Sequence, residues 1–536
     1  MRWFAVCLLL VGNALAQNAP QTPLPKFKAT EVEISPYRNS PFANGGVLHG
    51  DRYLWHQATL VDLIADAYSV DFDLVQGGPA WLERNRFEVT GLADPKTSKA
   101  DLKLMLQSLL ADRFGVVVHT GEKEMPAYVL TVPGKDGKTK MTESEAGGNT
   151  GCDPVGQPTP ELPLDLKCHN FTMDVLATSL HQFAGGYLDK VVVNKTGLKG
   201  EYDFELKWHA RQIYDKLGAA GGGISIFDAV SNIGLNLALE TASQQVLLVD
   251  KASNKPTPNA PDVAKLLPPA PPAVFEVATI KPSAPDEKQF ARISGNTVNV
   301  TGLPLSFLIS FAWDLNNNSK EQVVNAPKWY NDDKFDINAK VASEAVGQPG
   351  INSPPIDIED LKAMLRQLIT ERFQMKVHRE DRPMDAYTLY AAMPKMKTAD
   401  PTERTKYING PAPGGKDPRK TQPILNKLVT CQNMTMAEFA DEMQHFAGGY
   451  VYGPVLDKTG LGDARFDFTL SYSSADRTSG LPAPKADGTA LEASDPNGAV
   501  TLYDAVVKQL GLKLVKEKRP MPTLVFDSIQ EKPTEN

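Results

Sequence analysis

The sequence predicts an α+β protein made of two homologous modules in tandem. Three observations support this fold class: a long internal repeat, apolar residues at helical spacing, and short β-forming runs beside each such helix. Residues 102–132 align without a gap on residues 361–391, with 13 of 31 positions identical. Helices that each place one apolar face on an antiparallel pair of strands form α+β layers, so a doubly wound parallel sheet is not expected.

The chain begins with the features of a secretory signal peptide, residues 1–16. A charged start precedes the apolar run WFAVCLLLV, and the small residues ALA at 14–16 suit cleavage after Ala16. The apolar run is too short to span a bilayer, and no later run approaches the roughly 20 apolar residues of a transmembrane helix. We therefore expect a periplasmic or secreted protein with no transmembrane segment after signal removal.

Module one is predicted at 26–253 and module two at 274–530, separated by a proline-rich linker at 254–273. The linker holds seven prolines in twenty residues, which favours extended polyproline II. On both sides of it the repeated motifs follow one order. They pair as ATEVEISP with FEVATIKP, GGPAWLERNRFEV with NAPKWYNDDKFDI, FAGGY with FAGGY, NKTGL with DKTGL, and SIFDAVSNIGLNL with TLYDAVVKQLGLKL.

Within each module we expect amphipathic helices packed on antiparallel β-hairpins. In LKLMLQSLLADRF the apolar residues recur at i, i+3, i+4, i+7 and i+8 from Leu102. GVVVHT and AYVLTV follow as two β-rich runs around a polar turn. The same order recurs where TLVDLIADAY leads to DFDLVQ and RFEVTG, and where SIFDAVSNIG leads to LNLALE and QQVLLVD. The opening strand of a module should pair with one of these sheets.

Charge and cysteine content restrict the choice of partner and compartment. The formal net charge of −8 becomes about −9 without Arg2 and forms no basic stripe, so nucleic acid is not an expected partner. Cys152, Cys168 and Cys431 remain after signal removal, and the last two occupy equivalent places in the repeat. One interpretation is a Cys152–Cys168 disulfide that closes a loop rich in Gly and Pro. The alternative is that Cys168 and Cys431 are small buried hydrophobes and Cys152 is incidental.

No motif identifies a reaction. HExxH, CxxC, GxSxG, GxGxxG and the phosphate-binding P-loop are all missing from the sequence. His119 and His378 share the frame VHxxxxxMxAY, but neither has a second His or Cys at ligand spacing, so a structural imidazole bonded to backbone is favoured over a metal ligand or general base. KTG at 195–197 and 458–460 resembles a β-lactamase element, yet no serine has lysine three positions on. A turn is the simpler interpretation.

Paired carboxylates and aromatic residues leave further alternatives open. Surface roles are favoured over acid/base roles for the carboxylate pairs, and core positions are favoured over a binding platform for the aromatic ones. These residues are Asp101 with Glu122, Glu371 with Glu380, Trp81 with Phe87, and Trp329 with Phe335. The sequence therefore assigns no catalytic, cofactor-binding or metal-binding residue.

The combined motifs of module two resemble a soil-associated family of secreted proteins expanded in acidobacteria. They include FEVATIKP, APKWYNDDKFDINAK, LKAMLRQLITERFQMKVHREDRPMDAYTL and the C-terminal EKPTEN. Module one is a divergent copy that lacks the terminal pattern. The family is of unknown function, and related domains are similar to those attached to membrane metallopeptidases of the antibiotic-sensor type. The resemblance thus implies an extracytoplasmic sensing or binding domain.

We expect a non-catalytic, extracytoplasmic binding or interaction protein of the bacterial cell envelope, with an envelope ligand or protein as partner and no cofactor. Two linked copies suit a bivalent binder, since linkage raises effective concentration. Two alternatives remain: a secreted hydrolase whose site is assembled from residues distant in sequence, and a structural envelope component. The sequence favours a non-enzymatic role without deciding it.

Overall fold

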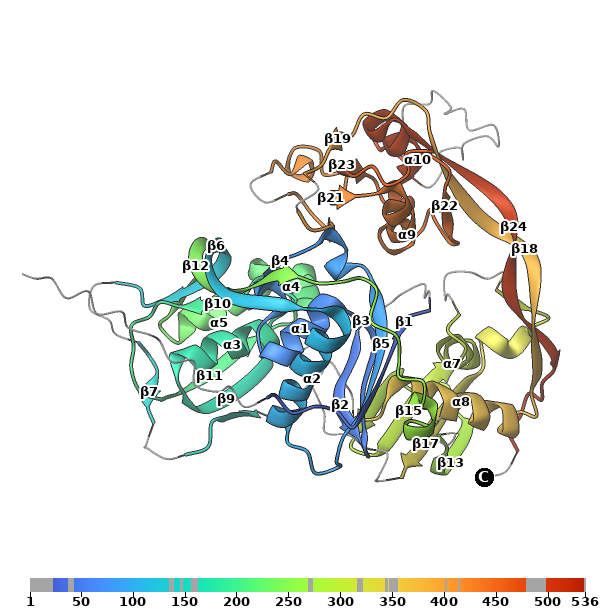
Figure 1. Ribbon diagram of the computed structural model, residues 1–536, viewed down its shortest axis with the longest axis horizontal. Helices are drawn as coiled ribbons and strands as arrows, with labels where there is room; N and C mark the ends of the chain where they lie inside the picture. Colours follow the sequence, from blue (N-terminus) through green and yellow to red (C-terminus); the bar gives the residue numbers. More distant parts are fainter. Residues whose placement is uncertain are drawn as a thin grey trace, which may run out of the picture.

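Each module folds into two lobes joined by a long two-stranded ribbon (Figure 1). We name the lobes N-lobe 1 and C-lobe 1 in module one, and N-lobe 2 and C-lobe 2 in module two. The computed structural model describes residues 23–534 except 37–42, 135–138, 145–147, 156–161, 269–272, 316–321, 343–345, 347–354, 401–402, 413–414 and 479–497. The predicted signal peptide, residues 1–16, lies outside the described residues.

N-lobe 1 is a four-stranded antiparallel sheet of order β1-β5-β3-β2 with two helices packed against it. Its elements are β1 (Ala29–Ile34), β2 (Asn44–His49), β3 (Arg52–Thr59), α1 (Leu60–Tyr68), η1 (Phe72–Leu74), η2 (Ala80–Glu83), β5 (Arg86–Leu92) and α2 (Lys99–Phe114). Helix α1 begins with a capping box in which Thr59 and Asp62 satisfy each other's backbone N–H groups. As expected, the opening strand β1 pairs with this sheet.

N-lobe 2 repeats this plan with the order β13-β17-β15-β14. Its elements are β13 (Phe275–Pro282), β14 (Phe290–Ser294), β15 (Thr297–Pro304), α7 (Leu305–Ala312), η4 (Lys328–Asn331), β17 (Lys334–Val341) and α8 (Ile358–Arg372). An edge-to-face aromatic pair joins sheet to long helix in both lobes, Phe87 with Phe114 and Phe335 with Phe373. The predicted α+β class and the repetition of the fold are therefore confirmed.

The C-lobes are four-stranded antiparallel sheets, each with one long and several short helices. C-lobe 1 contains β7 (Thr142–Glu143), β8 (Gly151–Pro154), β9 (Leu164–Phe171), α3 (Met173–Phe183), β11 (Tyr202–Trp208), α4 (Arg211–Leu217), η3 (Ala219–Gly221) and α5 (Ile226–Asn232). C-lobe 2 contains β19 (Lys397–Thr398), β20 (Lys406–Ile408), η6 (Pro418–Lys420), β21 (Lys427–Met434), α9 (Met436–Phe446), β23 (Phe466–Tyr472), η7 (Ala475–Thr478), α10 (Leu502–Ala505) and η8 (Val506–Leu510). The sheet orders are β7-β11-β9-β8 and β19-β23-β21-β20, so β8 and β20 are edge strands.

The ribbons pair strands that are far apart in the sequence. β6 (Val117–Thr131) pairs with β12 (Asn236–Lys251), and β18 (Lys376–Ala391) pairs with β24 (Leu512–Ser528), both antiparallel. Each ribbon also carries two short parallel strands, β4 (Val75–Gly77) and β10 (Val192–Asn194) in module one, and β16 (Val323–Val324) and β22 (Val455–Asp457) in module two.

The expected β-hairpins are wrong in both modules. In module two the two β-rich runs that follow helix α8 belong to the single strand β18. GVVVHT and AYVLTV belong to the single strand β6, and LNLALE and QQVLLVD belong to the single strand β12. The polar residues between the two runs of β6 continue the strand, because they pair with polar or small residues of β12 across a ribbon whose middle is largely exposed. DFDLVQ and RFEVTG likewise enter two different sheets, through β4 and β5.

One extra residue in module two is absorbed as a π-helical turn. SIFDAVSNIGLNL has 13 residues and TLYDAVVKQLGLKL has 14. The surplus residue lies in the π-helix η8, which ends at Gly511 with a φ of 68°. A Cβ at Gly511 would lie 1.7 Å from the carbonyl oxygen of Met393, so only glycine fits this turn.

The segment predicted as a linker includes one short helix, α6 (Val263–Leu266), in a stretch of six residues without proline. Its first part packs on module one: Asn259 Oδ1 accepts hydrogen bonds from the Val32 N–H at 2.9 Å and from Arg113 Nη2 at 2.6 Å. Extended polyproline II therefore does not describe the whole segment.

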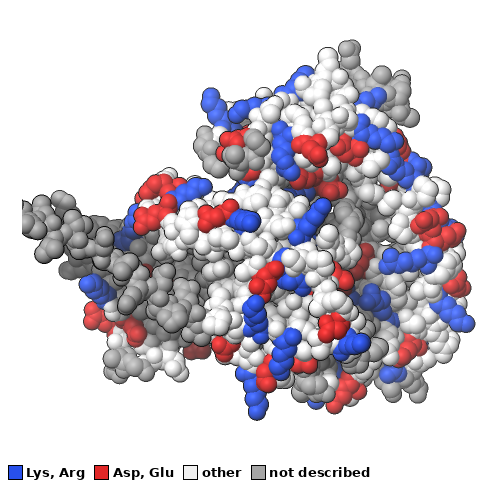
Figure 2. Space-filling model, in the orientation of Figure 1, with Lys and Arg blue, Asp and Glu red and all other residues white. Residues whose placement is uncertain are grey.

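N-lobe 1 contacts each of the other three lobes through charged residues. His181 and Lys190 of C-lobe 1 lie 3.4 Å and 3.6 Å from Asp71 and Asp73. The contacts with module two are described below. On the face drawn in Figure 2, acidic and basic side chains are interspersed. In the part of the chain that the structure describes, no helix is both long and apolar enough to span a membrane.

Candidate functional site: a charged cleft between the modules

N-lobe 1 and C-lobe 2 meet where η2 and the turn before it lie against the start of β20. The side chain of Arg404 is only 5% exposed; its Nε donates to the Gly77 carbonyl at 2.6 Å and its Nη1 donates to Glu83 Oε1 at 3.0 Å. The backbone N–H of Thr405 donates to the Ala80 carbonyl at 3.2 Å. Burial lowers the pKa of Arg404 despite the opposing effect of Glu83. This guanidinium therefore anchors the two modules to each other.

A second ion pair joins the same two lobes. Arg84, at the end of η2, bonds Glu442 of helix α9, and His445 lies 3.3 Å from the same carboxylate. Burial alone would raise the pKa of Glu442, but His445 and Arg84 outweigh burial and lower it. Glu442 is therefore held as a carboxylate at the interface.

These contacts border a cleft of about 290 Å³ that takes residues from both modules. We call it the inter-module cleft. It is lined by Ala43, Thr59, Asp62, Phe72, Glu83, Arg84 and Arg86 of module one and by Thr405, Lys406, Tyr407 and Glu442 of module two. Arg86 donates to the Gln57 carbonyl at 2.6 Å, and burial lowers its pKa.

The cleft depends on residues that differ between the two copies of the repeat. Aligning GGPAWLERNRF with NAPKWYNDDKF makes Asn331, Asp332 and Lys334 the equivalents of Glu83, Arg84 and Arg86. On the C-lobe side of the cleft, Tyr407 of β20 pairs with Cys431 of β21. In C-lobe 1, Cys152 of β8 pairs in the same way with Cys168 of β9, so Tyr407 is the equivalent of Cys152. Lys406 then corresponds to Gly151. The charges at Glu83, Arg84 and Lys406 are therefore particular to one copy, whereas Lys334 keeps the positive charge of Arg86.

A histidine held between two carboxylates connects the two N-lobes. His56 of β3 lies with Nδ1 2.7 Å from Glu88 Oε2 of β5 and with Nε2 3.2 Å from Asp357 Oδ2 of module two. Asp357 also caps helix α8, since its Oδ1 accepts from the backbone N–H groups of Glu359 and Asp360. Burial alone would lower the pKa of His56, but the two carboxylates outweigh burial and raise it to about 10. His56 is therefore an imidazolium at neutral pH.

The repeated histidines His119 and His378 lie on the exposed ribbons. Their Nδ1 atoms lie 2.8 Å from Asp250 and 2.9 Å from Asp527, so each has a carboxylate partner where a backbone partner was expected. Within the described residues, no group of three His, Cys, Asp or Glu side chains is placed to hold a metal ion. Neither histidine belongs to the inter-module cleft.

The other sequence candidates lie at separate places. Phe87 and Phe335 are buried in the N-lobe cores, with Trp81 and Trp329 packed against them, which supports their interpretation as core residues. The two KTG segments form turns. In each turn the threonine hydroxyl accepts a hydrogen bond from a backbone N–H two residues later, Thr196 from Leu198 and Thr459 from Leu461. The four carboxylates remain apart. Asp101 accepts a hydrogen bond from Ser98, the N-cap residue of α2, and Glu122 lies on β6. Glu371 accepts from Gln367, and Glu380 pairs with Arg382.

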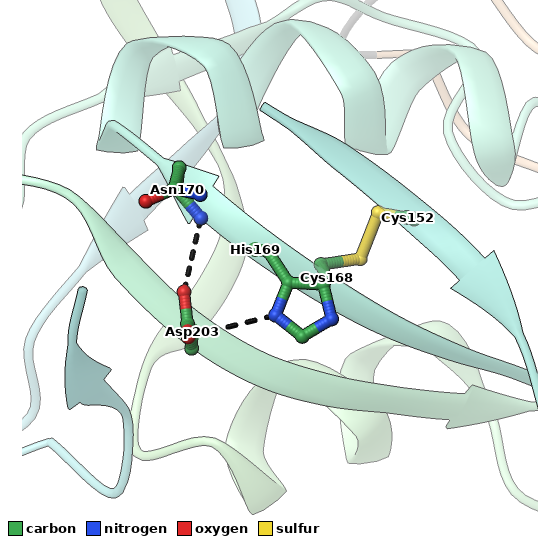
Figure 3. The surroundings of a disulfide bond; sticks show 5 residues. All are labelled: Cys152, Cys168, His169, Asn170 and Asp203. Atoms are coloured by element: carbon green, nitrogen blue, oxygen red, sulfur yellow. Dashed lines mark hydrogen bonds and ion pairs between the residues drawn. A yellow bond between two sulfur atoms is a disulfide. The ribbon is translucent and has the colours of Figure 1, made fainter. Parts of the chain in front are cut away.

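Cys152 and Cys168 form a disulfide between β8 and β9 of C-lobe 1 (Figure 3). Neither residue lines the inter-module cleft. Beside the disulfide the sheet has a bulge at Asn170, whose φ is 57° and whose backbone N–H donates to Asp203 Oδ1 at 3.0 Å. Asn433 and Asp467 repeat this bulge in C-lobe 2. There Cys431 is buried and free, and Tyr407 takes the position of Cys152.

Replacing Cys152 by serine should lower the free energy of unfolding by about 3 kcal/mol, because the disulfide closes a loop between residues 16 positions apart. Urea denaturation without reductant measures the change. Wild-type protein in dithiothreitol is the control and should fall to the value of the variant. Equal stability of variant and oxidised wild type would show that the bond does not restrict the unfolded chain.

Sequence reasoning missed the residues that join the modules, among them Arg404, Glu83, Arg84, His56 and Asp357. None belongs to a motif of known chemistry, and all act through partners at least 300 positions away. A signal was nevertheless present, since the repeat aligns Glu83 and Arg84 with Asn331 and Asp332, which do not match them in charge.

Comparison with known proteins gives a family but no relative of known activity. No curated protein and no solved structure matches the chain. A family described as "Protein of unknown function (DUF3738)" matches twice, at residues 61–252 and 306–529. The two matches fall in the two modules and together cover most of the chain. The chain therefore belongs to the DUF3738 family and contains its domain in two tandem copies.

Proposed function

We propose that this chain is a non-catalytic, extracytoplasmic binding protein of the bacterial cell envelope, and that its ligand occupies the inter-module cleft. The observation that carries the proposal is that the cleft is composite. One wall comes from N-lobe 1 and the other from C-lobe 2, and the charged residues on both walls differ from their equivalents in the other copy. Concave sites between domains are frequent ligand sites.

The duplication could give either one composite site between the modules or two equivalent sites, as in a bivalent binder. The differences between the two copies favour one composite site. Among the described residues, no ion pair joins Asp332 or Lys334 to C-lobe 1, whereas Arg84 pairs with Glu442 of C-lobe 2 and Arg86 lines the cleft beside it. Two equivalent sites would require that N-lobe 2 and C-lobe 1 form a second cleft with a similar lining. The proposal is therefore one ligand per chain.

The extracytoplasmic location rests on the sequence of residues 1–16 and on the resemblance to secreted acidobacterial proteins of soil-associated origin. A disulfide suits an oxidising compartment such as the periplasm or the exterior of the cell. Expression of the full chain in a bacterial host, followed by intact-mass measurement of the extracytoplasmic protein, should give a chain that begins at Gln17. A chain that stays in the cytoplasm with Met1 attached would refute this location.

Binding is tested by a thermal-shift screen of the mature chain against peptidoglycan fragments, oligosaccharides, β-lactams, peptides and divalent metals. A ligand at a hundredfold its Kd should stabilise the fold by about 2.7 kcal/mol. In the variant Arg86→Gln its affinity should fall at least tenfold, since a bond to a charged group contributes about 1.5–3 kcal/mol. Lys334→Gln, at the equivalent position of module two, is the matched control and should bind as wild type does. Ligands that bind both variants equally would place the site elsewhere.

A further inference from the structure

The inter-module cleft presents balanced charge to whatever enters it. Its lining has three cationic side chains, Arg84, Arg86 and Lys406, and three carboxylates, Asp62, Glu83 and Glu442. A purely anionic ligand would meet three carboxylates, and a purely cationic ligand would meet two guanidinium groups and an ammonium group. A ligand that carries both a positive and a negative group satisfies such a lining best, because each group finds an opposite charge.

Two of these six groups keep capacity for a ligand. Among the described residues, Arg86 donates a hydrogen bond to the Gln57 carbonyl and forms no ion pair, although the charges of Asp62 and Glu442 act to raise its pKa against the effect of burial. Asp62 accepts both bonds from Thr59 at Oδ2, and no described residue bonds its Oδ1. The remaining charges are engaged across the interface, Arg84 with Glu442 and Lys406 with Glu83 at 3.8 Å. Arg86 and Asp62 can therefore receive a carboxylate and an ammonium group.

The other wall of the cleft offers a strand edge. β20 is the last strand of its sheet and pairs only on one side, with β21, among the described residues. The Thr405 N–H already bonds the Ala80 carbonyl of N-lobe 1 beside the cleft, so the backbone groups of Thr405 point away from β21. Backbone direction alternates along a strand, so the N–H and C=O of Tyr407 point to the same side. An extended peptide can pair with such an edge through its own backbone.

We propose that the inter-module cleft binds a short peptide with free termini, whose backbone pairs with the edge of β20 at Tyr407 and whose carboxylate is held by Arg86. The ammonium terminus is held by Asp62. The cleft volume of about 290 Å³ restricts the bound part to a few residues with small side chains. This inference rests on the proposed function, because it names the ligand class of the same site.

The test is isothermal titration calorimetry of the mature full-length chain with trialanine, N-acetyl-trialanine, trialanine amide and maltotriose. Trialanine suits the test because strand pairing uses the backbone and needs no particular side chain. Trialanine should bind, each blocked terminus should weaken binding at least tenfold, and maltotriose should not compete. In Arg86→Gln, trialanine and its amide should bind equally, whereas Lys334→Gln should keep the tenfold difference between them.

The outcomes separate the inference from the proposed function. Equal binding of blocked and free peptides, or no binding of trialanine, overturns the peptide assignment. Binding of maltotriose that is lost in Arg86→Gln overturns the peptide assignment and supports the cleft as a ligand site. If no compound of the wider screen depends on Arg86, both the peptide assignment and the proposed function are overturned.

Discussion

Replacing Arg404 by alanine should detach C-lobe 2 from N-lobe 1 and cost about 3 kcal/mol. Removing one partner of a buried ion pair leaves the other partner's charge unpaired and typically costs about 3–5 kcal/mol. We expect a cost at the lower end of this range, because the Glu83 side chain is 14% exposed and Lys406 remains 3.8 Å from its carboxylate. The Gly77 carbonyl also loses the bond from Arg404.

Detachment should be visible because C-lobe 2 connects to N-lobe 2 through the ribbon of β18 and β24. Small-angle X-ray scattering of Arg404→Ala should give a larger radius of gyration than wild type, and calorimetry should split the thermal unfolding into separate transitions. Asn149→Ala, at the equivalent place of module one, is the matched control and should change neither quantity. An unchanged radius of gyration in Arg404→Ala would mean that other contacts fix C-lobe 2.

The same variant tests how the interface supports the cleft. A double-mutant cycle with Glu83→Gln isolates the coupling between the two side chains from the loss of the Gly77 bond. If the pair acts as a unit, the two substitutions together should cost clearly less than the two single costs added. Additive costs would show that Arg404 stabilises the interface mainly through Gly77.

Much of the fold could be predicted from local pattern. The helix at 99–114 follows from its apolar spacing, its serine N-cap and the glycine that ends it in the left-handed conformation. The ribbons could not be predicted in the same way. The residues from Thr120 to Glu124 have the composition of a turn, and only their pairing with β12, more than 100 positions away, keeps them extended.

The inter-module cleft could not be predicted from the sequence for a related reason. The pattern within a module determines which face of a helix or strand is buried, and it is nearly the same in both copies. The cleft depends on how N-lobe 1 and C-lobe 2 meet, which is a property of pairs such as Arg84 with Glu442. The match between residues 102–132 and 361–391 indicates the fold that both modules share. Positions where the modules differ in charge, such as Arg84 and its equivalent Asp332, indicate where the modules contact each other.

The contact between the N-lobes should depend on pH through His56. Its pKa rises from 6.5 in the unfolded chain to about 10 in the folded protein, so its contribution is complete below pH 6.5 and is lost as pH rises through about 10. The His56 imidazolium lowers the pKa of Glu88 and Asp357 against the effect of burial, so their contribution is complete above pH 4.5 and is lost at lower pH. The three groups together stabilise the folded protein most between about pH 4.5 and 6.5.

The size of the effect follows from the pKa of His56. Each pKa unit corresponds to about 1.4 kcal/mol, so the wild type should lose at most about 5 kcal/mol of unfolding free energy between pH 6.5 and 10 from this residue. Lysine and tyrosine also titrate near pH 10, so the informative quantity is the difference in unfolding free energy between wild type and His56→Gln. That difference should be largest near pH 6 and decline towards pH 10.

Urea denaturation at steps of half a pH unit measures this difference, and His378→Gln provides the matched control. His378 also pairs with an aspartate, but its side chain is 50% exposed and lies on the ribbon. Its substitution should therefore cost under about 1 kcal/mol, as for an exposed ion pair. A difference between wild type and His56→Gln that stays constant from pH 6 to pH 10 would mean that His56 contributes packing rather than charge. A declining difference would identify the group of His56, Glu88 and Asp357 as a charge-dependent link between the two N-lobes.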